Sequence, residues 1–148
     1  MFHILLVDDS IGDALTVLEA CRSSPIKADV QVAYDGEQAL EFLSDKNFKP
    51  DLILQDLNLP KLDGFALLER YRAGNGPPVV VFSGSDAASD KKRVMELGAR
   101  GYVVKPLGFH EFVKSIHELV EQWSRKAAAA NRLNSEALTL RGRGTVTH

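Results

Sequence analysis

Cysteine is almost absent from this chain of 148 residues, because Cys21 is the only one. A single cysteine can form neither an intrachain disulfide nor a cysteine-based metal cage. Long apolar runs are also missing, and none approaches the ~20 residues needed to span a membrane. The first apolar run, Phe2–Val7, is too short for the core of a signal peptide and ends in two aspartates. We therefore expect a cytoplasmic protein with no membrane partner.

The chain has little net charge, -2 overall, but this charge is unevenly distributed. Residues 124–148 carry five basic side chains and one glutamate, a charge of +4, so residues 1–123 carry -6. An acidic body argues against a broad nucleic-acid surface. We expect no DNA partner, although the basic tail leaves a small opening for one.

The hydrophobic content of 45% is ordinary for a globular protein, and the length suits one domain with a proper core. Five short apolar runs recur roughly every 25 residues, the length of one strand plus a returning helix. They are residues 2–7, 30–33, 52–54, 79–82 and 102–104. Because the runs are continuous rather than alternating, they favour strands buried on both faces of a parallel sheet.

The segments between these runs carry helix signals. Ser10 to Asp13 is typical of a capping box, and we expect Leu15 and Leu18 on the buried face of the helix that follows. Asp35 is predicted to cap the second helix, and Gly98 to end the fourth. A long apolar stripe predicts the last helix; its members are Phe109, Phe112, Ile116, Leu119, Val120 and Trp123.

The pattern therefore predicts an α/β protein with five βα units, (βα)5, in one domain over residues 1–123. Residues 124–148 are expected to form a basic helix extension and tail with no output domain. Ala127 to Ala130 can extend the last helix for a turn or two. No period continues beyond Asn131, so we expect a frayed or partner-ordered tail there.

Charged and polar residues stand at the carboxyl ends of the predicted strands: Asp8, Asp9, Asp56, Ser83 and Lys105. Ligands of open parallel sheets bind beyond those ends. Two carboxylates about 4 Å apart repel by ~4 kcal/mol at an effective dielectric of ~20, so three need a counter-charge such as Mg²⁺. Mg²⁺, a lysine and a hydroxyl around one carboxylate suit the oxygens of a transferring phosphoryl group. Asp56 would then be the nucleophile and form an aspartyl phosphate.

Four groups of residues carry a family resemblance: Val7-Asp8-Asp9-Ser10, the run 54–60 with Asp63-Gly64, Phe82-Ser83-Gly84, and 102–106 ending in Lys105-Pro106. In this order and at these strand ends, they resemble the receiver domain of two-component response regulators over residues 2–123. The resemblance implies a doubly wound, flavodoxin-like sheet with strand order 2-1-3-4-5. It also implies a protein that catalyses only its own phosphorylation and dephosphorylation.

The resemblance assigns a role to each matching residue. Asp56 accepts the phosphoryl group from a sensor kinase phosphohistidine, and Mg²⁺ (Mn²⁺ as a substitute) is bound by Asp9, Asp56 and the backbone carbonyl of Asn58. Asp8 holds metal-bound water.

Three further positions take part in the switch that the resemblance implies. Lys105 pairs with a phosphoryl oxygen, Ser83 reaches the transferred group, and Tyr102 turns inward. The family also has a cis bond at the position of Lys105-Pro106. No other cofactor is implied.

The implied partners are a sensor histidine kinase or a phosphotransfer protein, and a second copy of the chain. The family's usual dimer surface consists of the fourth helix, fifth strand and fifth helix, which Trp123 would extend. A narrower resemblance, to stand-alone regulators paired with phytochromes, favours a phytochrome as the kinase. It is partial, because the loop at 74–78 is shorter than in that group and the tail differs.

Other functions share parts of this pattern. A phosphatase of the haloacid dehalogenase type needs a second aspartate two residues after the nucleophile, where this chain has Asn58. A pseudo-receiver that acts as a phosphorylation-independent interaction module would not need the intact acidic set. A flavin-binding fold is disfavoured because Asp8 and Asp9 would repel a phosphate from the following helix.

Overall fold

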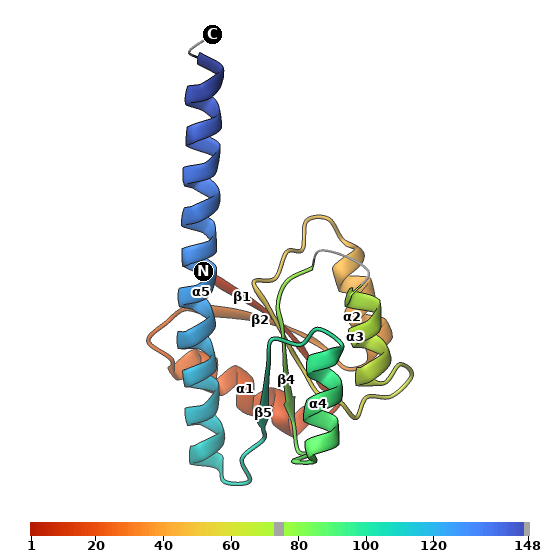
Figure 1. The fold of residues 1–148 in the computed structure, drawn as a ribbon. Coiled ribbons are helices and arrows are strands. Elements are labelled where there is room, and N and C mark those ends of the chain that lie inside the picture. Colours follow the sequence, from red (N-terminus) through yellow and green to blue (C-terminus); the bar gives the residue numbers. More distant parts are fainter. Residues whose placement is uncertain (73–75, 147–148) are drawn as a thin grey trace.

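Five parallel strands form one sheet in the order β2-β1-β3-β4-β5 (Figure 1). The computed structural model describes residues 1–72 and 76–146. The strands are β1 (Phe2–Val7), β2 (Ala28–Ala33), β3 (Leu52–Gln55), β4 (Val79–Ser83) and β5 (Gly101–Val104). The helices are α1 (Ile11–Ser23), α2 (Gly36–Ser44), α3 (Gly64–Arg72), α4 (Ala88–Glu96) and α5 (Phe109–Val146). The predicted fold class and strand order are confirmed.

The three inner strands are buried almost throughout, as the continuous apolar runs predict. Every residue of β3 and β4 is buried, and in β1 only His3 is exposed. The edge strand β2 differs, because exposed and partly buried residues alternate along most of it. The other edge strand, β5, is partly buried at every residue.

Helices cover both faces of the sheet. On one face α1 and α5 pack over a core cluster that contains Leu6, Leu54, Phe82 and Ile116. On the other face α2, α3 and α4 cover Leu5, Ile53 and Val81 with their neighbours. Trp123 is 7% exposed and belongs to the first cluster. Its expected place on a dimer surface is therefore wrong, because the indole completes the core beneath α5.

The buried face of α1 is not the one predicted. Leu15 is 61% exposed and Leu18 is 37% exposed. The helix buries Ala14, Val17, Ala20 and Cys21 instead. Because α1 packs against both the sheet and α5, its inner face needs small side chains that allow close approach.

The helix ends follow local capping chemistry. Asp35 caps α2 by accepting a hydrogen bond from the Gln38 amide at 2.8 Å. Gly98 ends α4 with a φ of 100°, a left-handed conformation that glycine adopts without strain. At α1 only half of the predicted capping box forms: Ser10 Oγ accepts from the Asp13 amide at 3.2 Å, but the Asp13 carboxylate does not return to Ser10.

The last helix is much longer than predicted. α5 runs for 38 residues, about 57 Å at 1.5 Å per residue, and extends far beyond the sheet (Figure 1). The expectation of a frayed tail after Asn131 is therefore wrong for the described residues. Ala127 to Ala130 have high helix propensity, and Arg125 pairs with Glu121 one turn earlier, so the helix continues without a buried face. No helix in the described part of the chain combines the length and the apolar character of a membrane span.

The short loop before β4 is described only in part. Gly74 and Asn75 lie outside the described residues, so the expected loop of 74–78 is not tested there. Pro77 and Pro78 are half-buried and lead directly into β4.

The two faces of α1 give a matched pair of substitutions. Val17→Ala should lower the free energy of unfolding by about 1.5–3 kcal/mol, because it removes two buried methyl groups and leaves a cavity. Leu15→Ala should change it by less than about 0.5 kcal/mol, because the side chain is exposed. Urea unfolding of both variants checks this, and equal losses would show that Leu15 is buried after all.

Candidate functional site

The pairing of β1 with β3 brings three carboxylates together at the carboxyl edge of the sheet. The Asp56 amide donates to the Val7 carbonyl at 2.9 Å, so Asp56 lies beside the end of β1. One carboxylate oxygen each from Asp8, Asp9 and Asp56 lies within 4.8 Å of the others. Asp8 and Asp56 are buried and Asp9 is exposed. The residues predicted from strand ends therefore form one acidic pocket that is open on one side.

Lys105 crosses from the edge strand β5 to this pocket. Its ammonium nitrogen lies 2.7 Å from Asp8 Oδ2, 2.8 Å from Asp13 Oδ2 and 2.9 Å from Asp56 Oδ2. The Lys105 amide donates to the Ser83 carbonyl at 2.8 Å, which fixes the backbone at the end of β4. The side chain is only 11% exposed, so one buried cation partly neutralises three anions.

The remaining oxygens of the buried carboxylates bind backbone amides. Asp8 Oδ1 accepts from the Ser10 amide at 2.9 Å, and Asp56 Oδ1 accepts from the Leu57 amide at 2.7 Å. Both carboxylates are therefore held in fixed orientations by their own loops. The order of the pocket does not depend on long flexible side chains except for Lys105.

Burial and pairing shift two pKa values in the pocket. Burial raises the pKa of Asp8 above its usual range, although its hydrogen bond to Lys105 acts in the opposite direction. Burial alone would lower the pKa of Lys105, but the hydrogen bonds to Asp13 and Asp8 outweigh it and raise this pKa. The stability that a raised lysine pKa contributes is present below the ordinary value of about 10.4 and is lost as the pH rises through the higher folded value.

The donor atoms of the pocket fit a hard divalent cation. Mg²⁺ prefers oxygen ligands, keeps several waters and takes only one or two carboxylates from the protein. Asp8, Asp9 and Asp56 offer carboxylate oxygens, and the open side next to Asp9 leaves space for water. Asn58 follows in the exposed loop after β3. Asp8, Asp9 and Asp56 are the residues whose carboxylates could hold the ion.

Ser83 and Tyr102 lie on the two strands next to the pocket. Ser83 is fully buried at the end of β4, and its hydroxyl accepts from the Ser85 amide at 3.3 Å. Tyr102 on β5 is half-buried, and its hydroxyl donates to the Ser85 carbonyl at 2.7 Å. Ser85 Oγ in turn donates to Asp90 on α4 at 2.6 Å. Both predicted switch residues therefore contact the same loop between β4 and α4.

The loop after Asp56 is fixed by close packing. Gln55, a polar residue in the buried strand β3, donates from Nε2 to the Gly64 carbonyl at 2.9 Å. A Cβ at Gly64 would lie 2.6 Å from the Leu57 Cα, so no larger residue fits. Lys61 has a φ of 67° and lies at the centre of a turn in which the Leu62 amide donates to the Pro60 carbonyl at 2.8 Å. A three-residue turn with a positive φ at its central residue is rare, and it is strained for residues other than glycine.

Asp13 is the site residue that the sequence analysis missed. Its position in the first turn of α1 indicated only a cap, which was sufficient to explain an acidic residue there. No local signal separates it from an ordinary cap, because its partner Lys105 lies 92 residues away in the sequence. The structure shows its carboxylate on Lys105 rather than on the helix terminus.

The predicted cis bond between Lys105 and Pro106 is wrong. Within the described residues every peptide bond is trans. A bond before proline still prefers the trans form by about 0.5–1 kcal/mol. In this structure the trans bond already lets the Lys105 ammonium reach all three carboxylates.

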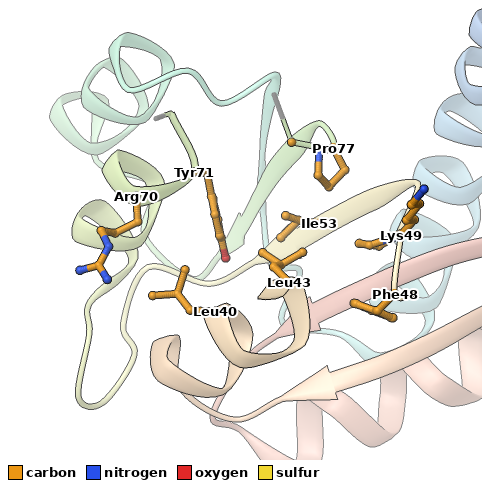
Figure 2. A pocket seen from close by; sticks show the side chains of 10 residues that line it. Leu40, Leu43, Phe48, Lys49, Ile53, Arg70, Tyr71 and Pro77 are labelled. Carbon is orange, nitrogen blue, oxygen red and sulfur yellow. The ribbon is translucent and has the colours of Figure 1, made fainter. Parts of the chain in front are cut away.

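A larger hollow than the one beside Lys105 lies between α2, β3 and α3. It measures about 620 Å³ and has mostly apolar walls. Figure 2 shows the Tyr71 hydroxyl among Leu40, Leu43 and Ile53, while Lys49 and Arg70 lie at opposite ends of the hollow. Burial raises the pKa of Tyr71. Since no charged group converges on this hydroxyl, the hollow has no recognisable chemistry.

Comparison with known proteins decides the family. The model of the response regulator receiver domain matches residues 4–117. The chain belongs to the response regulator receiver family. Receiver domains are phosphoacceptor switches, so an acidic pocket at the carboxyl edge of the sheet is expected in this family.

Two curated relatives of this receiver are regulators by name. A probable transcriptional regulator, ycf27 of Porphyridium aerugineum, is 32% identical over 137 residues, which is 93% of this chain and 55% of the relative. The nitrate/nitrite response regulator protein NarL of Escherichia coli is 34% identical and is matched over 59% of its length, with 92% of this chain. The chain thus spans a little more than half the length of these relatives.

Solved structures of phytochrome-associated regulators are also similar. The Mn²⁺-bound form of the response regulator Rcp1 has a TM-score of 0.75 and 31% identity, covering 83% of this chain and 94% of that one. The phosphorylated cyanobacterial phytochrome response regulator RcpA has a TM-score of 0.78 and 30% identity, covering 82% and 93%. The Mn²⁺ in Rcp1 agrees with the cation preference inferred above from the donor atoms.

Removal of the Lys105 charge tests the electrostatic balance of this receiver. Lys105→Met should lower the free energy of unfolding of the metal-free protein by about 3 kcal/mol at neutral pH, because it leaves buried carboxylates without a cation. Added Mg²⁺ should restore more stability to this variant than to the wild type. Thermal unfolding with and without Mg²⁺ measures both effects.

Lys91→Met is the control for this substitution, since Lys91 forms its ion pair at the surface with the exposed Asp86 and its loss should change stability little. A Lys105→Met variant as stable as the control would contradict the balance described here.

Proposed function

We propose that this receiver is a phosphoacceptor switch in which Asp56 takes a phosphoryl group from a sensor kinase. The observation that supports it is the position of the Asp56 carboxylate: it lies within the acidic cluster, and Lys105 contacts its Oδ2 at 2.9 Å. In the transfer the bond from phosphorus to the histidine nitrogen breaks. A bond from phosphorus to a carboxylate oxygen of Asp56 forms, and the histidine is left free.

Each predicted site residue has a place in this proposal. Asp9, Asp56 and the backbone carbonyl of Asn58 would hold Mg²⁺ or Mn²⁺, and Asp8 would orient water bound to the ion. The cation supplies charge that stabilises the oxygens of the transferring group. Lys105 donates to a phosphoryl oxygen, and Ser83 donates from the neighbouring strand.

The response to phosphorylation would pass through the loop between β4 and α4. A phosphoryl group adds roughly -1.5 to -2 of charge at the pocket. Ser83 would turn toward this charge and give up its contact with the Ser85 amide. Because Tyr102 also binds Ser85, a change in this loop would release the phenol to turn inward. The proposed switch therefore connects Asp56 to the surface of α4 and β5.

The chain offers an apolar surface beside the pocket on which a kinase can dock. Ile11, Leu15 and Leu18 form an exposed stripe on α1. Leu107, in the loop before α5, and Phe109, at the start of α5, are exposed as well. We place the kinase here because a phosphohistidine has to reach Asp56 while its helix packs on nearby apolar groups.

The exposed stripe of α1 and the segment with Leu107 and Phe109 flank one hollow next to Lys105. The hollow measures about 390 Å³, and its walls include Asp13 and Thr16 of α1 together with Leu107 and Phe109. An apolar partner surface that covers α1 and this loop would therefore also cover the entrance to the pocket.

Two further partners belong to the proposal. The likeness to RcpA, a phytochrome response regulator, favours a phytochrome as the kinase, with a phosphotransfer protein as the alternative donor. We also propose a homodimer through α4, β5 and α5.

Substitution of the phosphoacceptor gives the direct test. Asp56→Asn should keep the fold and abolish phosphorylation by acetyl phosphate with Mg²⁺, because an amide cannot form the acyl phosphate. The wild type should gain one phosphoryl group, as measured by intact mass. Asp86→Asn is the matched control, since Asp86 is an exposed acid near the same edge that does not contact Lys105.

The same samples on a sizing column report whether phosphorylation drives the proposed dimer. A gain of mass in Asp56→Asn equal to that of the wild type would overturn the assignment. If the wild type neither gains mass nor binds Mg²⁺, the chain is a phosphorylation-independent pseudo-receiver.

The proposed kinase surface has its own test. Leu15→Arg should slow phosphoryl transfer from a phosphorylated histidine kinase by about tenfold or more, because a charge in an apolar contact has to be desolvated. It should leave the rate with acetyl phosphate unchanged, because a small donor does not contact α1. Radiolabel transfer measures the first rate and intact mass the second. Unaltered transfer from the kinase would move the docking surface away from α1.

A further inference from the structure

All three hydrogen-bond donors of the Lys105 ammonium are used by carboxylates. Two of the acceptors, Asp8 and Asp56, lie in the acidic cluster that fits a divalent cation. The third, Asp13, belongs to α1 and lies outside that cluster. A lysine has three donors and no acceptor, so none is left over while the three contacts persist.

The Asp13 carboxylate has no other hydrogen-bond partner among the described residues. Ser10, which a capping box would pair with it, instead donates its amide to Asp8. The side chain is 37% exposed, so it keeps access to water on one side. Its position in the first turn of α1 also stabilises a negative charge through the helix dipole. Asp13 is therefore a fixed anion whose main protein partner is Lys105.

An ion in the acidic cluster would draw on two carboxylates that Lys105 also contacts, Asp8 and Asp56. To the extent that it weakens those two contacts, Asp13 becomes the main protein partner of the lysine. Without Asp13, the buried ammonium would either remain on Asp8 and Asp56 or lose every protein partner. Both alternatives disfavour metal binding, since an unpaired buried cation is costly.

We propose that Asp13 is a positioning residue that retains Lys105 beside the pocket when the metal binds, and thereby favours metal binding. The inference rests on the function proposed above. One donor of Lys105 then remains on Asp13. The two donors that contact Asp8 and Asp56 in the metal-free protein become free. The lysine is thus kept within reach of a group attached to Asp56.

Calorimetric titration with Mg²⁺ tests this role. Asp13→Asn should raise the Kd for Mg²⁺ about tenfold, part of it from the lost charge and part because a neutral amide holds the Lys105 ammonium more weakly than a carboxylate does. Glu19→Gln on the same helix is the matched control: its carboxylate pairs with Arg22 on the exposed side, and its removal should change the Kd less than about twofold.

A double-mutant cycle separates the two causes. In a Lys105→Met background, Asp13→Asn should raise the Kd only about two- to threefold, because the charge effect alone remains. An equal change in both backgrounds would mean that Asp13 acts only as a distant charge, which overturns the proposal. A Kd for Asp13→Asn within twofold of the wild type overturns it as well.

Nitrogen-15 NMR of the Lys105 ammonium gives a readout that does not depend on activity. In the wild type the ammonium signal should persist after Mg²⁺ is added, because Asp13 still holds it. In Asp13→Asn the signal should be lost to exchange with water at saturating Mg²⁺, and its persistence there would contradict the proposal.

Failure of this inference can be distinguished from failure of the proposed function. Suppose that the wild type binds Mg²⁺ and takes a phosphoryl group, and that the Asp13→Asn variant behaves like the control. That result overturns only the proposed role of Asp13. A wild type that does not bind Mg²⁺ removes both.

Discussion

A sheet that is buried on both faces leaves room for charge only at its ends, and this constraint shapes the whole molecule. The inner strands of this receiver are apolar along their length, so their first polar side chains appear where the strands stop. Parallel pairing then places those side chains at one edge. Carboxylates collected in this way repel one another, and Lys105 is the buried cation that offsets the repulsion in the metal-free protein. The repulsion among these carboxylates is thus the reason that the site attracts cations.

Much of this arrangement could be predicted from the sequence, because its two main signals are local. The β-branched runs at 30–33 and 79–82 fall inside strands of the structure, and Asp35 and Gly98 end or begin helices where expected. Asp56 and Lys105 could be found because a charge directly after an apolar run has few structural explanations.

The features that were missed depend on contacts between distant parts of the chain. In α1 the apolar residues Leu15 and Leu18 and the small residues Ala14 and Val17 both follow a helical period. Only the position of α5 decides which face is buried. Asp13 has a sufficient local explanation as a cap, so its contact with Lys105, 92 residues away in sequence, leaves no local trace. The length of α5 was underestimated because helix propensity without an apolar stripe is a weak signal.

The length of α5 gives this receiver a mechanical property. The same continuous helix packs beside the pocket at Phe112 and continues for 23 residues past Trp123, about 35 Å at 1.5 Å per residue. A straight rod of that length turns small angles into large displacements: a tilt of about 5° at its base moves its far end by about 3 Å. Any rearrangement that tilts the base of α5 therefore produces a displacement that grows with distance along the helix.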